Sequence, residues 1–172
     1  LAFRTAPTHF ASKKTKFYIL SSSDLQNWNY EKEFFCQSDM REPRFLVYKD
    51  QLLFYYFIGG KRMFRFEPHQ IMVSQFREEK FSDSKSIGLD GYVCWRFKAH
   101  KDTIYLSAYY GVNLYNASHA ADLRLFSSTD GYSFSKLSEK PQCDWTGAEE
   151  GEFEFDEEGN LWATIRLESD GA

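Results

Sequence analysis

Short runs of aromatic and β-branched residues recur along the chain, and turn residues separate them. Helical periodicity is nearly absent, whereas alternation of polar and apolar residues is common, as in Glu152-Phe153-Glu154-Phe155. Alternation with period two is typical of half-buried β-strands. The pattern therefore predicts an all-β protein.

Three of the predicted hairpins resemble one another and recur at a period of about fifty residues. Their turns lie near positions 50, 102 and 158. A further strand pair follows each of the first two hairpins, and the N-terminal residues supply a third such pair. Four-stranded units at this period predict a β-propeller. A β-sandwich is the structural alternative, but it does not predict like hairpins at a fixed period.

The repeats suggest one propeller region over residues 1–172. It divides into a partial blade (1–38), two blades (39–91 and 92–145) and the inner hairpin of a further blade (146–172). We therefore expect an incomplete piece, about three to four blades, of a five- or six-bladed propeller. If the chain is not a piece of a larger propeller, its exposed sheet edges would require closure by self-association.

Composition narrows the range of partners. The net charge is −4 and the pI is about 5.6, which argues against a nucleic-acid or anionic-membrane surface. The longest apolar run, residues 51–60, is too short to cross a bilayer. The three cysteines and four histidines form no metal-binding pattern, so neither a metal nor a cofactor is expected. The aromatic content of 19% favours strands and contacts with carbohydrate.

Charged residues gather where the inner strands of the predicted blades begin. Because these starts converge on one face of a propeller, we expect their side chains to form the functional site. The N-terminal stretch from Phe3 to His9 is a fourth such start. The candidates are Arg4, His9, Arg41, Glu42, Arg96, Glu150 and Glu152.

The hairpin from Glu150 to Arg166 adds one more candidate. A carboxylate opens its first strand and a guanidinium closes its second, so Glu150 and Arg166 come side by side. This layout suits a catalytic acid beside an anion-binding arginine. A surface hairpin with a cross-strand salt bridge is the alternative.

Two turns, Ser22 to Trp28 and Ser128 to Phe134, share a Ser-x-Asp pattern and an aromatic residue four positions after the Asp. The carboxylate can accept hydrogen bonds from backbone amides of a tight turn, with the Ser hydroxyl in support. The aromatic residue anchors the turn. Both turns resemble the Asp boxes of the sialidase superfamily, one residue shorter than the common spacing. Such boxes are structural, so Asp24 and Asp130 are not catalytic candidates.

The segment from Glu150 to Arg166 is similar to a sialidase segment in which a Glu precedes the turn and an Arg ends the return strand. The resemblance implies a glycoside hydrolase that acts on an anionic or complex glycan. Glu150 would then serve acid/base chemistry by assisting a tyrosine nucleophile, and Arg4 and Arg166 would bind the substrate carboxylate. The chain departs from the pattern because no Asp lies between Arg4 and Asp24. The resemblance also favours a secreted or periplasmic location.

A second resemblance involves Arg41-Glu42-Pro43, which is similar to the Arg-Asp-Pro of five-bladed furanosidase-type glycosidases. It implies that Glu42 stabilises an oxocarbenium-like transition state. Glu150 or Glu152 would complete the carboxylate set, with a nucleophilic Asp upstream of Leu1. A glycan-binding propeller without catalysis is the alternative of a different class. In every case the expected partner is carbohydrate.

Overall fold

The computed structural model describes residues 1–112, 122–145 and 147–167. Within these residues the chain forms antiparallel β-strands and no helix, so the all-β prediction is confirmed. No helix that could span a membrane is therefore found in this part of the chain.

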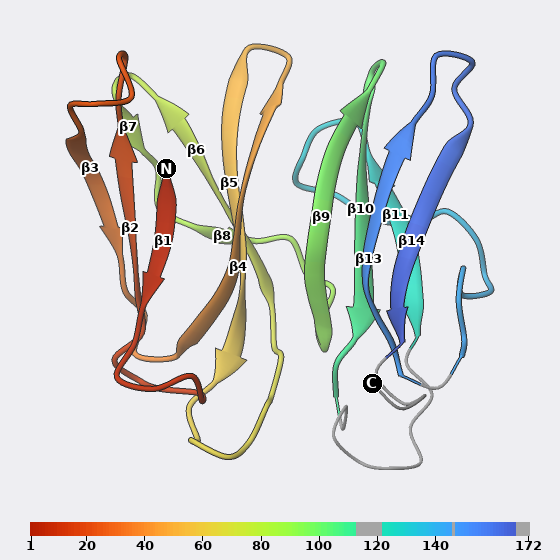
Figure 1. Ribbon diagram of the computed structural model, residues 1–172, viewed down its shortest axis with the longest axis horizontal. Helices are drawn as coiled ribbons and strands as arrows, with labels where there is room; N and C mark the ends of the chain where they lie inside the picture. The colour runs from red at the N-terminus through yellow and green to blue at the C-terminus, as the bar shows by residue number, and fades with distance from the viewer. Residues whose placement is uncertain (113–121, 146, 168–172) are drawn as a thin grey trace.

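The strands form four antiparallel sheets in chain order (Figure 1). The first sheet contains β1 (Ala2–Thr5), β2 (Lys16–Ser21) and β3 (Asn29–Phe34). The second contains β4 (Asp39–Tyr48), β5 (Gln51–Gly60), β6 (Ile71–Arg77) and β7 (Lys80–Phe81), and β8 (Lys85–Ser86) also pairs with β6. The third contains β9 (Tyr92–His100), β10 (Thr103–Tyr110), β11 (Leu123–Ser128) and β12 (Ser135–Lys136). The fourth is the hairpin of β13 (Ala148–Phe155) and β14 (Leu161–Leu167).

Successive sheets lie side by side and contact one another through their first strands. β1 contacts β4, β4 contacts β9, and β9 contacts β13. This is the arrangement of propeller blades, as the repeat predicted, with β4, β9 and β13 forming the inner row of strands. The tight turns near positions 50, 102 and 158 are also present.

The first strand, β1, differs from the prediction. Figure 1 shows that β4, β9 and β13 run upward, whereas β1 runs downward like β5 and β10. The Ser22–Trp28 turn joins β2 to β3, and the Ser128–Phe134 turn joins β11 to β12, the third and fourth strands of their sheet. β1 therefore corresponds to a second strand. The prediction that Phe3 to His9 starts an inner strand was wrong, because Arg4 lies near the end of β1 rather than before it.

β5 explains the longest apolar run of the sequence. Its side chains alternate between two cores, with Leu53, Tyr55 and Phe57 in one and Phe54 and Tyr56 in the other. All five are buried, because the second sheet is covered on both faces by its neighbours. A strand buried on both faces needs a continuous apolar run rather than alternation.

The two Ser-x-Asp turns have the hydrogen bonds that their sequence predicts. In each turn one carboxylate oxygen accepts two backbone amides, at 2.9 and 2.8 Å for Asp24 and at 2.7 and 2.8 Å for Asp130. These amides hold the pKa of both carboxyl groups low, to about 2 for Asp130. The aromatic anchors differ: Phe134 packs edge-on against Tyr55, but Trp28 is exposed.

Candidate functional site

A β-bulge interrupts each of the inner strands β4, β9 and β13 near its start. In β4, Arg41 lies opposite Phe57 and Arg44 lies opposite Tyr55. Two residues of β4, Glu42 and Pro43, therefore face the single residue of β5 between Tyr55 and Phe57. In β13, the register shifts in the same way between Glu149 and Glu152, and in β9 it shifts beside Trp95. Bulges are frequent next to active sites because they redirect a side chain out of the ladder.

The bulges of β4 and β13 place a glutamate at the same position. Glu42 has a φ of 55° and Glu150 a φ of 42°, both in the left-handed region that β-carbons disfavour. Each is followed by a residue suited to a break in the ladder, Pro43 or Gly151. A β-carbon on Gly151 would meet Leu123 at 2.8 Å, so glycine permits this close approach.

Both glutamates line one cavity of about 270 Å³, here called the carboxylate cavity. β4 and β5 supply Arg41, Glu42 and Phe57; β9 and β10 supply Val93 and Tyr109; β13 and β14 supply Glu149, Glu150 and Arg166. His9 and Phe66 reach it from the loops after β1 and β5. Of the predicted site residues, the cavity thus brings together His9, Arg41, Glu42, Glu150 and Arg166.

Glu42 lies in a mixed environment on β4. Its carboxylate receives a hydrogen bond from the Arg44 guanidinium at 2.6 Å, and its side chain is 27% exposed. Burial raises the pKa of Glu42 above its ordinary value, and the negative charge of Glu150 raises it further. Arg44, Arg41 and Arg96 act in the opposite direction without cancelling the increase.

Glu150 has its cationic partner on the neighbouring strand. The Arg166 Nη1 atom lies 3.0 Å from Glu150 Oε2, so the predicted approach of Glu150 and Arg166 is present. Glu149, beside it on β13, is buried. Three carboxylates therefore face the same cavity.

Sequence reasoning missed Asp39, the residue that fixes the start of β4. Its side chain is fully buried and accepts hydrogen bonds from Arg4 Nη2 and Arg41 Nε, both at 2.6 Å, and from Thr15 Oγ1 at 2.8 Å. Arg41 also donates to the backbone carbonyl of His9 at 2.8 Å, which ties the loop after β1 to β4. The Asp39-Met40-Arg41 pattern at the start of an inner strand was the available signal.

The other predicted residues lie outside the cavity lining. Arg4 reaches Asp39 from β1, and Arg96 pairs with Glu152 farther along the inner strands. The Arg44 guanidinium lies over the ring of Trp95, 5.2 Å from the ring centroid. Among the described residues no cluster of His, Cys, Asp and Glu is arranged to hold a metal ion.

A spacing rule in the sequence would have matched the two glutamates. Glu42 lies eight residues before the turn residue Asp50, and Glu150 lies eight residues before Glu158. Aligning the hairpins on their turns therefore superposes Glu42-Pro43 on Glu150-Gly151. The bulges themselves were not predictable, because they follow from the ladder register.

No protein-family model matches this chain, and no curated protein matches it. Among solved structures, the chain is similar to an α-L-arabinofuranosidase from Lactobacillus brevis, with a TM-score of 0.58 and 12% sequence identity. The match covers 99% of this chain and 62% of the arabinofuranosidase, so the chain spans less than two thirds of that structure. The likeness supports a glycosidase-like fold.

Proposed function

We propose that this chain forms part of a glycoside hydrolase in which Glu42 and Glu150 cleave a glycosidic bond. The single observation that carries the proposal is the pair of equivalent bulges, which turn both glutamates into one cavity despite left-handed backbone at each. Strained backbone next to a cavity is common where side chains must be held for chemistry. The fold similarity to an arabinofuranosidase supports the same class of reaction.

The two carboxyl groups suit different roles. The raised pKa of Glu42 favours a protonated carboxyl group that can donate to the leaving glycosidic oxygen. Glu150, whose carboxyl group lies 3.0 Å from the Arg166 guanidinium, takes the proton of the attacking water in this proposal. In this proposal Glu42 is the general acid and Glu150 is the general base.

Sialidase-type binding of a substrate carboxylate is less well supported. That mechanism needs arginines whose guanidinium groups are available to the substrate. Arg4 and Arg41 are bound to Asp39, Arg96 to Glu152 and Arg166 to Glu150. Protein carboxylates therefore already occupy the arginines that the sialidase resemblance would assign to the substrate, which favours a mechanism based on two carboxylates.

The test is hydrolysis of aryl α-L-arabinofuranosides and aryl sialosides by the full natural chain. We expect Glu150→Gln to lower turnover by about 10²–10⁴-fold, because the variant cannot accept a proton. Glu154→Gln is the matched control, since Glu154 lies on the same strand beyond the bulge and is exposed. Near wild-type turnover of Glu150→Gln would contradict the assignment.

A glycan-binding propeller without catalysis is the second candidate. It is favoured by one observation, that Glu42 and Glu150 each already have an arginine partner. This candidate predicts saturable sugar binding that survives Glu150→Gln, with no product from any glycoside. Isothermal titration of wild type and variant alongside the turnover assay separates the two candidates.

A further inference from the structure

A second pocket opens beside the carboxylate cavity, between the loop after β1 and the loop after β5. Its volume is about 320 Å³, and we call it the loop pocket. It is lined by His9, Phe10, Ala11, Arg41, Met63, Phe64, Arg65 and Phe66. His9, Arg41 and Phe66 also line the carboxylate cavity, so the two spaces adjoin.

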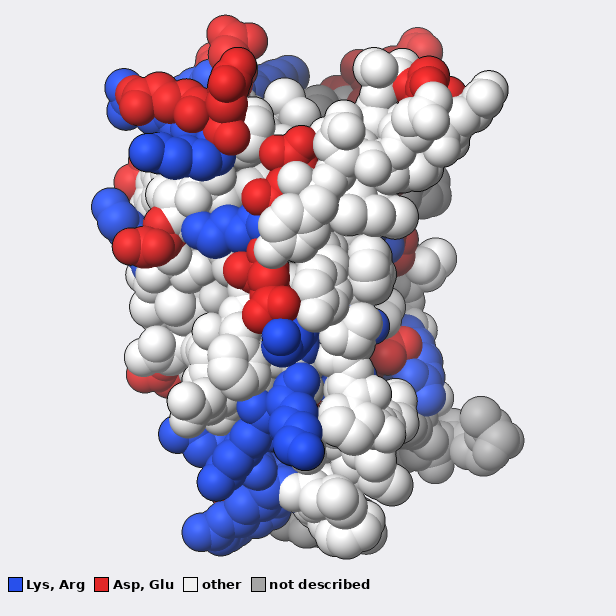
Figure 2. All heavy atoms as spheres, turned by 90° about the vertical axis from the view of Figure 1, so that its left-hand side faces the viewer, with Lys and Arg blue, Asp and Glu red and all other residues white. Residues whose placement is uncertain are grey.

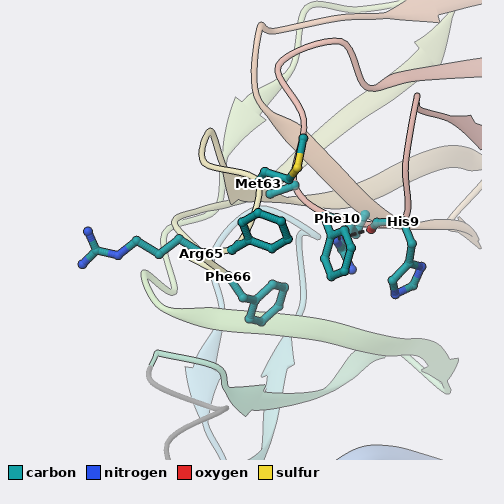
Figure 3. Close-up of a pocket in the computed structure, with 8 residues that line it drawn as sticks. His9, Phe10, Met63, Arg65 and Phe66 are labelled. Carbon is teal, nitrogen blue, oxygen red and sulfur yellow. Dashed lines mark hydrogen bonds between the residues drawn. The ribbon is translucent and has the colours of Figure 1, made fainter.

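The loop pocket presents apolar side chains to solvent. Figure 3 shows Phe10, Met63 and Phe66 gathered around it, with the Arg65 side chain extending away. Phe10 and Phe64 meet edge to face with centroids 5.2 Å apart, yet Phe64 is 82% exposed and Phe10 49%. Exposed apolar clusters of this kind with a polar rim mark binding sites.

The two loops that form the loop pocket carry several cations although the chain as a whole is acidic. Lys13, Lys14, Lys61 and Arg62 belong to the same two loops and are exposed. Within the part of the chain that the structure describes, none of the four makes an ion pair. Figure 2 shows Lys and Arg gathered at the lower end of this face, where Figure 1 places both loops, whereas toward the upper end they are mixed with Asp and Glu. The loops around the pocket therefore concentrate positive charge on a protein of net charge −4, which favours an anionic ligand there.

We propose that the loop pocket is a subsite for a uronic-acid residue of the glycan whose bond lies in the carboxylate cavity. The aromatic rings suit the apolar face of a sugar ring, and the unpaired cations suit its carboxylate. The anionic group is thus recognised by the loops rather than by the paired arginines of the cavity. The inference rests on the proposed carbohydrate function of the adjoining cavity.

The experiment compares trigalacturonate with its methyl ester by isothermal titration on the full natural chain. The two probes share a backbone and differ at the carboxyl groups, which are charged in the acid and neutral methyl esters in the other probe. We expect the acid to bind about tenfold more tightly at low salt, and the difference to shrink at high salt. The double variant Lys61→Glu/Arg62→Glu should remove that difference, whereas Lys80→Glu, at the opposite end of β6 and β7, should preserve it.

The aromatic contribution is tested separately. Phe64→Ala should weaken binding of acid and ester alike by about fivefold. Because Phe64 is exposed, the variant is expected to fold, which circular dichroism can check.

Several results would overturn the subsite. These are equal binding of acid and ester, binding of neither, no effect of the loop double variant, or equally tight binding of tetraglutamate, which would show attraction by charge alone. The proposed hydrolysis is assayed independently with neutral arabinofuranosides. Hydrolysis of arabinofuranosides without binding of trigalacturonate would support the proposed function and contradict the subsite. Binding of trigalacturonate without hydrolysis would support the subsite and contradict the proposed hydrolysis.

Discussion

The bulges of β4 and β13 both bring a glutamate to the carboxylate cavity, but they differ in the arginine partner and in the residue that follows the glutamate. In β4, Glu42 pairs with Arg44 on its own strand, and Pro43 occupies the second position of the bulge. In β13, Glu150 pairs with Arg166 across the hairpin, and Gly151 occupies that position. Both place a glutamate in the left-handed region beside the carboxylate cavity.

The ion pairs beside the two bulges differ in how deeply they are buried. β4 begins at Asp39, a fully buried carboxylate bound by two arginines, whereas the Arg166 side chain that faces Glu150 is 51% exposed. Buried charge is costly unless every partner is present, and exposed pairs contribute little. Position in the bulge therefore brings each glutamate to the cavity, while the surrounding residues set its ion-pair partner. Each prediction below tests one part of this difference.

The largest effect should come from Asp39→Asn. The amide cannot balance Arg4 and Arg41, so we expect the free energy of unfolding to fall by about 3 kcal/mol. Arg166→Gln, at the exposed pair, should cost about 1 kcal/mol or less. Chemical denaturation of both variants measures the difference, and equal costs would contradict it.

A smaller effect should follow from relieving the left-handed backbone. Glycine adopts a φ near 42° without strain, so Glu150→Gly should be less destabilising than Glu152→Gly by about 1 kcal/mol. The two glutamates are matched, because both lie on β13 and each has an arginine partner. If Glu150→Gly is the more destabilising of the two, the bulge backbone is not strained.

The smallest effect concerns pH. Because the pKa of Glu42 is raised in the folded chain, the fold holds this proton to higher pH than the unfolded chain does. Its contribution to stability is therefore present below the ordinary value of 4.5 and is lost as pH rises through the folded pKa.

Glu42→Gln should remove that loss, so the decline in the free energy of unfolding above pH 4.5 should be smaller in the variant than in wild type. Denaturation at several pH values measures the decline, with Glu152→Gln as the variant on the other strand. A decline that is unchanged in Glu42→Gln would show that this carboxyl group is not the one that titrates.

The local structure of this chain could be predicted from its residues alone. Period-two alternation and turn residues sufficed for the hairpins, because strand and turn preferences act over a few residues. The Ser-x-Asp turns were predictable for the same reason, since every hydrogen bond of the Asp130 carboxylate is made within three residues. The sequence also singled out Glu42 and Glu150 as candidates.

The partners and positions of those candidates, in contrast, depend on the tertiary structure. That Arg4 binds Asp39, that Glu42 and Glu150 share a cavity, and that β1 is a second strand all depend on contacts between sheets. Such contacts join residues 35 or more positions apart, and no local preference specifies them. Burial, which raises the pKa of Glu42, is likewise a property of the packed sheets rather than of the chain around it.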